Sequence, residues 1–73
     1  MTQHDQLCRG LRALGHRLDP NARTARYSVF TDAQRPGGHW YVGKAGALRA
    51  GATVTGSHSC SSIIRRRVME AGV

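Results

Sequence analysis

Acidic residues are scarce in this 73-residue chain. Aspartate and glutamate together contribute four residues, lysine and arginine contribute 11, and the formal net charge is +7 at pH 7. Ten of the 11 basic residues are arginine, and Lys44 is the only lysine. The chain has no paired carboxylates for acid–base chemistry, and its basic surface is typical of a nucleic-acid-binding protein. A solvated arginine-rich surface, or one that binds an acidic protein, has the same composition.

The chain also has no long apolar run and only two cysteines. No stretch approaches the roughly 18 apolar residues that a membrane-spanning helix needs, so we expect no membrane association. The stretch MTQHDQLCRG lacks the apolar core of a secretion signal. We therefore expect a cytoplasmic protein, in the host cytoplasm if a phage encodes it, with Cys8 and Cys60 as free thiols.

The length and the hydrophobic pattern predict one small α+β domain over residues 1–73. An N-terminal helix is expected over residues 3–18, because four leucines recur on one helical stripe before Asp19-Pro20 stops it. A C-terminal helix is expected over residues 61–71, with Ser59 or Ser61 as its N-cap and Gly72 as its C-cap.

Between the two helices, alternating and aromatic residues predict a small antiparallel sheet of three to four strands. The expected strands cover residues 25–32, 39–43, 47–50 and 53–55. Residues 34–38 contain Pro36 and two glycines and are typical of a turn. A sheet of this size with an open edge makes a homodimer possible.

The segment Tyr41-Val42-Gly43-Lys44, followed by Leu48-Arg49, resembles part of the motif of GIY-YIG nucleases. The resemblance implies that Tyr27, from an earlier strand, enters the same site. The family's catalytic arginine would fall near Gly51, and Glu70, near the end of the chain, is the only glutamate. The segment therefore also fits a degenerate, non-catalytic nuclease remnant, and Lys44 between glycines fits either a phosphate-binding turn or a plain hairpin turn.

The final helix carries three successive arginines after a serine-rich loop. Backbone amides at the start of a helix attract anions, and arginine side chains bind phosphate, so this region is a candidate phosphate-binding platform. With Ile63, Ile64 and Val68 buried, Arg66 is expected to point outward. One of two neighbouring aromatic residues on the second strand is expected to be exposed for base stacking. The predicted binding residues are Lys44, Arg49, Arg65, Arg66, Arg67, Trp40 and Tyr41.

Two histidines and two cysteines raise the question of zinc. His4 and Cys8 are one helical turn apart, and His58 and Cys60 alternate in the serine-rich loop. Four such donors suit tetrahedral zinc, but these spacings match no familiar zinc signature, so we predict no metal and no cofactor.

The sequence therefore predicts a small non-enzymatic module that binds DNA or RNA through arginine–phosphate contacts. The alternative is a phage or mobile-element inhibitor or adaptor that places the same arginines on an acidic surface of a host protein. A degenerate nuclease remnant is the third interpretation.

Overall fold

The computed structural model describes residues 1–22 and 24–73, and the elements follow one another as helix, five strands, helix. The α+β class is confirmed. The bounds are α1 Gln3–Ala13, β1 Arg17–Leu18, β2 Tyr27–Thr31, β3 His39–Gly43, β4 Leu48–Gly51, β5 Ser57–Ser59 and α2 Ser62–Ala71.

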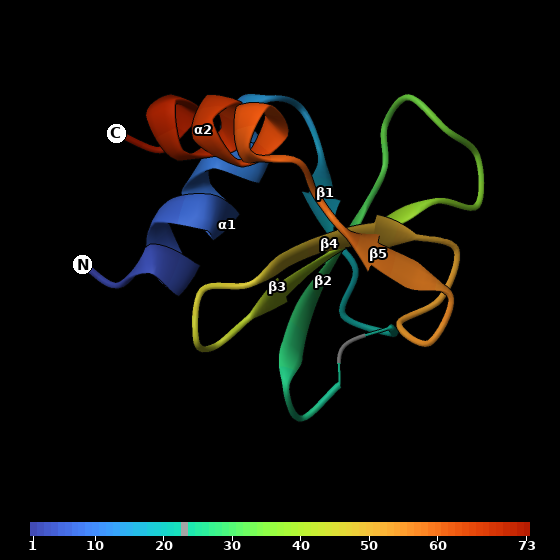
Figure 1. The fold of residues 1–73 in the computed structure, drawn as a ribbon. Helices are drawn as coiled ribbons and strands as arrows, with labels where there is room; N and C mark the ends of the chain where they lie inside the picture. The colour runs from blue at the N-terminus through green and yellow to red at the C-terminus, as the bar shows by residue number, and fades with distance from the viewer. Residues whose placement is uncertain (23) are drawn as a thin grey trace.

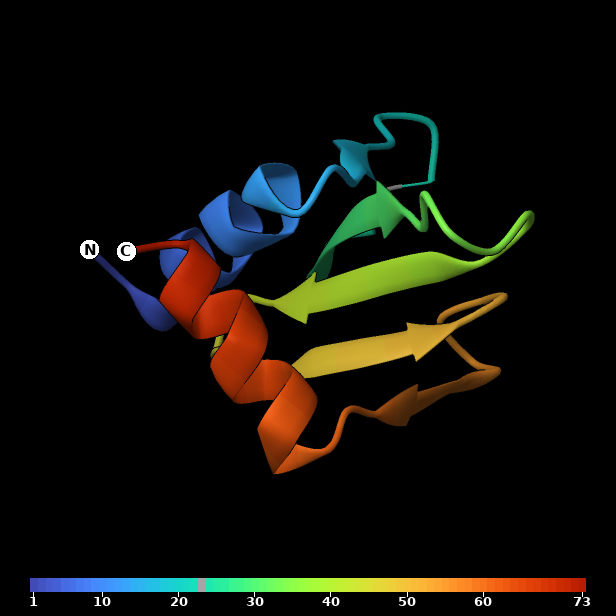
Figure 2. The same ribbon diagram turned by 90° about the horizontal axis from the view of Figure 1, so that it is seen from above.

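The five strands form one antiparallel sheet in the order β1-β2-β3-β4-β5, so each strand pairs with the next along the chain. Both helices lie on the same side of this sheet, next to each other (Figures 1 and 2). The loop from residue 32 to residue 38 joins β2 to β3 and projects beyond the sheet (Figure 1). Among the described residues, no helix is long and apolar enough to cross a membrane.

The core lies between the helices and one face of the sheet. Leu7 and Leu11 of α1 and Val68 of α2 are fully or almost fully buried against the central strands. Phe30, Val42 and Leu48 supply the sheet side of this cluster. Burying a side chain of this size stabilises the fold by about 1.5–3 kcal/mol, so these few residues dominate the stability of a chain this short.

The two helices approach each other closely at Gly10. A Cβ atom at this position would lie 1.9 Å from the carbonyl oxygen of Val68, so only glycine fits. Gln6 adds a side-chain hydrogen bond from Nε2 to the carbonyl oxygen of Met69, at 2.8 Å. A glycine that weakens α1 in isolation therefore permits its packing against α2.

The predicted end of the first helix was wrong. The helix stops at Ala13 rather than at residue 18, because Gly15 takes φ +95° and the chain turns there. His16 is then buried, and Arg17–Leu18 pairs with β2 as the edge strand β1. The leucine stripe continued past the helix end, which is why the periodicity alone overestimated the length.

The last strand also lies later than predicted. Residues 53–55 belong to the turn between β4 and β5, where the backbone amide of Gly56 donates to the carbonyl oxygen of Thr53 at 3.1 Å. Strand β5 begins at Ser57 and takes the place of the strand expected over residues 53–55. The unexpected edge strand β1 is the addition that gives the sheet five strands rather than three or four. The strand over residues 39–43 agrees fully with its prediction, while β2 and β4 begin one or two residues later than predicted.

The final helix agrees with its prediction in bounds and caps. Ser61 is the N-cap, and its hydroxyl accepts from the backbone amide of Ile64 at 3.3 Å. The predicted burial of the two isoleucines was wrong: Ile63 is 73% exposed and Ile64 is 38% exposed. Only Val68 of that apolar set is buried, because the short helix meets α1 and the sheet along a narrow stripe.

Candidate functional site

Two of the predicted binding arginines hold the fold together. Arg65 donates from Nη1 to the carbonyl oxygen of Gly46 and from Nη2 to Gln3 Oε1 at 3.2 Å, which ties α2 to the β3–β4 turn and to α1. Arg49 donates from Nε to Ser57 Oγ at 2.8 Å and from Nη2 to the carbonyl oxygen of Ser57 at 2.6 Å. Both guanidinium groups therefore already have acceptors within the chain.

The other three predicted cations are exposed. Arg66, Arg67 and Lys44 make no side-chain hydrogen bond or ion pair within residues 1–22 and 24–73. Arg66 and Arg67 are neighbours on α2, whereas Lys44 lies in the β3–β4 turn. The seven predicted residues thus do not form one patch.

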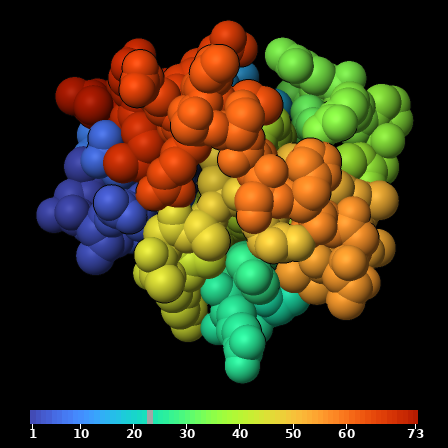
Figure 3. All heavy atoms as spheres, viewed as in Figure 1, coloured from blue at the N-terminus to red at the C-terminus, as the bar shows by residue number. Residues whose placement is uncertain are grey.

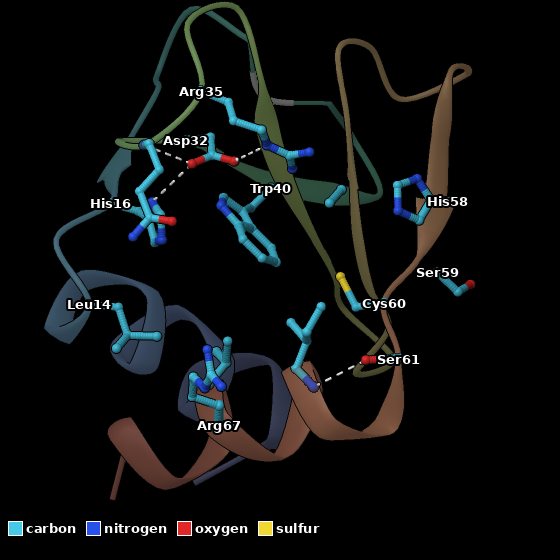
Figure 4. Close-up of a pocket in the computed structure, with 14 residues that line it drawn as sticks. Leu14, His16, Asp32, Arg35, Trp40, His58, Ser59, Cys60, Ser61 and Arg67 are labelled. Carbon is cyan, nitrogen blue, oxygen red and sulfur yellow. Dashed lines mark hydrogen bonds and ion pairs between the residues drawn. The ribbon is translucent and has the colours of Figure 1, made fainter.

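A pocket of about 660 Å³ lies between α2, the end of β5 and the β2–β3 loop. Figure 3 shows the corresponding hollow between the orange-red helix and the green loop. We call it the Trp40 pocket, after the ring at its centre in Figure 4. Its polar walls include His16, Asp32, Arg35, His58, Ser61 and Arg67.

The β2–β3 loop places a second arginine over this pocket. Asp32, whose side chain is 3% exposed, accepts from Arg35 Nε at 3.0 Å and from the backbone amide of Gln34 at 2.9 Å. Burial alone would raise the pKa of Asp32, but these hydrogen bonds and the nearby charges outweigh it, so its pKa lies below the usual value. The Nε edge of Arg35 is thereby fixed, and its two Nη groups have no partner in the described part of the chain.

The buried histidine at the back of the pocket is a hydrogen-bond acceptor. The backbone amide of Ala33 donates to His16 Nδ1 at 3.0 Å, so this nitrogen is the acceptor of a hydrogen bond from the β2–β3 loop. The same Nδ1 lies 3.9 Å from Asp32 Oδ1, too far for a hydrogen bond. His16 therefore holds the β2–β3 loop in place through the hydrogen bond from Ala33.

Neither predicted stacking ring is freely exposed. Tyr41 is 4% exposed on the sheet face away from the helices, and burial raises its pKa. Trp40 lies on the helix face, half-buried, with its ring 5.4 Å from that of His16. Its Nε1 atom is buried and has no hydrogen-bond partner in the described chain. A buried donor without an acceptor costs about 1–3 kcal/mol and commonly marks a functional position or a bound water.

The β3–β4 turn uses its own amides. Gly43 N donates to the carbonyl oxygen of Ala47 at 2.8 Å, and Gly46 N donates to that of Gly43 at 2.9 Å. These amides are therefore occupied by the hairpin, which favours the interpretation of this glycine-rich stretch as a turn.

Three of the residues that resemble the nuclease motif, Tyr27, Tyr41 and Arg49, lie on the sheet face away from the helices, whereas Val42 and Leu48 belong to the core on the opposite face. The rings of Tyr27 and Tyr41 meet edge to face, 6.3 Å apart, and Arg49 pairs with Tyr41 across β3 and β4. Glu70 belongs to α2, which packs on the opposite face of the sheet. Tyr27, Tyr41 and Arg49 thus cluster, but the only glutamate lies across the sheet from them.

The histidines and cysteines form two separate pairs. Cys8 Sγ lies 3.7 Å from His4 Nε2, which also lies 2.9 Å from Ser28 Oγ. His58 and Cys60 line the Trp40 pocket. Residues 1–22 and 24–73 contain no group of three or more such side chains placed to hold a metal ion. Both cysteines are free thiols, as predicted, and burial raises the pKa of each.

Sequence reasoning missed three residues of the Trp40 pocket. Asp32 precedes the predicted turn and Arg35 lies within it, and an aspartate three residues before an arginine is a weak local signal for a loop ion pair. His16 was assigned to the first helix because the periodicity continued through it. Only the chain reversal at Gly15 brings it to the pocket.

Comparison of this chain with protein-family models, with curated proteins and with solved structures gave no match.

Proposed function

We propose that this protein binds nucleic acid through contacts between exposed arginines and backbone phosphates. The observation that carries the proposal is the convergence of Arg35, from the β2–β3 loop, and Arg67, from α2, on one pocket. These residues are far apart in sequence and both have guanidinium groups free to donate. Arginine is well suited to phosphate because its planar donors can bind two oxygens at once.

Three further features support the proposal. Arg66 is exposed next to Arg67 and extends the positive surface along α2. The N-terminus of this ten-residue helix lies at the pocket, through Ser61, and its positive dipole end favours an anion. The net charge of +7 adds long-range attraction toward a polyanion.

A fluorescence-anisotropy titration tests the proposal. A labelled single-stranded oligonucleotide of mixed sequence, as DNA and as RNA, should associate with the protein at low salt, and a labelled duplex serves as the comparison. The absence of association with all of these at low salt would refute nucleic-acid binding.

A protein partner is the second candidate, and the exposure of Ile63 favours it. This side chain is 73% exposed on α2, one turn before Arg66 and Arg67. An apolar residue beside cations suits an acidic protein surface with an apolar centre, as an inhibitor or adaptor would use. Pull-down from a nuclease-treated lysate with wild type and with Ile63→Ser tests it: a protein partner that is retained by wild type and lost by the variant supports this candidate.

A further inference from the structure

We infer that the Trp40 pocket is a subsite for one unpaired nucleotide, which takes the base against the apolar wall and the phosphate at the arginine rim (Figure 4). The inference rests on the proposed function and specifies which part of the nucleic acid the protein reads. A nucleotide at a strand end, a nucleotide displaced from a strand and a free mononucleotide all have this chemistry.

The size and the lining of the pocket fit such a ligand. A volume of about 660 Å³ lies within the range of roughly 300–1,000 Å³ that is typical of small-molecule sites. Leu14, Ile64 and Val68 form an apolar wall opposite Trp40 and Ala50. Leu14 and Ile64 are 41% and 38% exposed, so the wall is open to a ligand from solvent.

Positive charge surrounds the opening of the pocket. Arg35 and Arg67 come from opposite sides, and Ser61 marks the start of α2. Asp32 is the only acidic residue among the lining side chains, and Arg35 already neutralises it. The net charge that faces a ligand is therefore positive, which favours a phosphate and disfavours an uncharged or cationic ligand.

Two hydrogen-bonding groups of the pocket lining suit the edge of a base. Trp40 Nε1 is a donor that lacks an acceptor in the described chain and has almost no exposed surface, and the exposed ring of His58 can donate or accept. Bases carry both donors and acceptors on one planar, apolar frame, which matches this mixture of groups. An acidic peptide would satisfy the arginines, but its carboxylates offer no planar apolar frame to place against the apolar wall.

Trp40 provides a direct signal because it is the only tryptophan in the chain. Its emission, excited at the red edge of the indole band, should change saturably when a nucleoside monophosphate is added. The unphosphorylated nucleoside and inorganic phosphate, tested separately, should each bind at least about tenfold more weakly, because each offers half of the contacts. A short single-stranded oligonucleotide should produce the same change, and a blunt duplex should not.

Variants of the two rim arginines test whether these side chains bind the phosphate group. Arg67→Gln should weaken monophosphate binding by roughly tenfold, and this side chain makes no hydrogen bond or ion pair with residues 1–22 or 24–73. Arg35→Gln should do the same, although it also loses the bond to Asp32. Arg9→Gln is the matched control: it removes the same charge from an exposed position on α1, outside the pocket, and should leave the affinity within about twofold.

The outcomes separate this inference from the proposed function. An unchanged Trp40 emission with every nucleotide, together with oligonucleotide binding by anisotropy, overturns the pocket and leaves the proposed function in place. Equal binding of nucleoside and nucleotide also overturns it, as does a response to an acidic peptide alone. A response to the oligonucleotide but not to the mononucleotide supports a subsite within a strand, and a response to both supports a general nucleotide site.

Discussion

Asp32 is a buried acidic side chain at the start of the β2–β3 loop. It is surrounded by donors, from the amide of Gln34 and from Arg35, and these hold the β2–β3 loop over the pocket. The sequence indicated a turn here, through Pro36 and its glycines, but not the aspartate that anchors it. The signal was local and weak, since Asp-x-x-Arg occurs in many loops without burial.

We expect Asp32→Asn to lower the stability of the fold by about 1–3 kcal/mol at neutral pH, because it removes the charge from a buried acceptor of two hydrogen bonds. The pKa of Asp32 is lower in the folded protein than its usual value of 3.8. Its contribution is therefore complete above that value and is lost as the pH falls through the folded pKa. Urea denaturation of both proteins at several pH values should show the difference shrinking below about pH 4. A difference that stays constant with pH would contradict this role.

Neighbouring arginines on α2 have different roles, and the sequence separated only Arg66, which was expected to point outward and is exposed. Arg65 donates to Gly46 and Gln3, whereas Arg66 is exposed without a partner in the described chain. Helical geometry indicated that the three arginines point in different directions. It did not show which direction meets the β3–β4 turn, because that depends on how the helix sits on the sheet.

Arg65→Gln should therefore affect the stability of the fold, and Arg66→Gln should affect oligonucleotide binding. The first should lower stability by about 1–2 kcal/mol, because it breaks charge-assisted hydrogen bonds between elements. The second should leave the melting temperature nearly unchanged, as surface substitutions usually do, and should weaken oligonucleotide binding. Thermal melts and anisotropy titrations on both variants test the contrast, and the reverse pattern would contradict it.

The contact between α1 and α2 decides how the helices cover the sheet. The core leucines of α1 follow from the sequence pattern, and so does the last helix with its Ser61 cap. The end of α1 at Ala13 does not follow from the sequence pattern. Gly15 takes a left-handed conformation that ends the helix, although the leucine stripe continues beyond it. The position of β5 was likewise set by tertiary contacts, since Arg49 binds Ser57 across the last hairpin.

Gly10→Ala should destabilise the protein although alanine favours helices by about 1 kcal/mol. The added methyl group would meet the carbonyl oxygen of Val68 and push the helices apart, which typically costs about 1–3 kcal/mol overall. The melting temperature should fall by several degrees, at roughly 4–8 °C per kcal/mol for a chain of this size. Arg9→Ala, on the solvent side of the same helix, is the control and should change it little. A Gly10→Ala protein as stable as wild type would contradict the close helix contact.

At the scale of the whole molecule, composition predicted a basic surface and the hydrophobic pattern predicted the class of fold, but neither predicted the site. The charge of +7 indicated a basic surface. The fold then assigned Arg49 and Arg65 to structural contacts and brought Arg35 and Arg67 to one pocket. Arg35 in the loop and Arg67 in the helix are more than 30 positions apart in sequence, so no local sequence pattern predicts that they line the same pocket.

The salt dependence of oligonucleotide binding tests the central claim most directly. Three exposed arginines, Arg35, Arg66 and Arg67, should release about three counterions, so the logarithm of the association constant should fall with the logarithm of the salt concentration with a slope of about −2 to −3. The slope should become shallower by about one for Arg67→Gln and stay nearly unchanged for Arg9→Gln. Binding that is independent of salt, or a slope that Arg67→Gln leaves unchanged, would contradict the account.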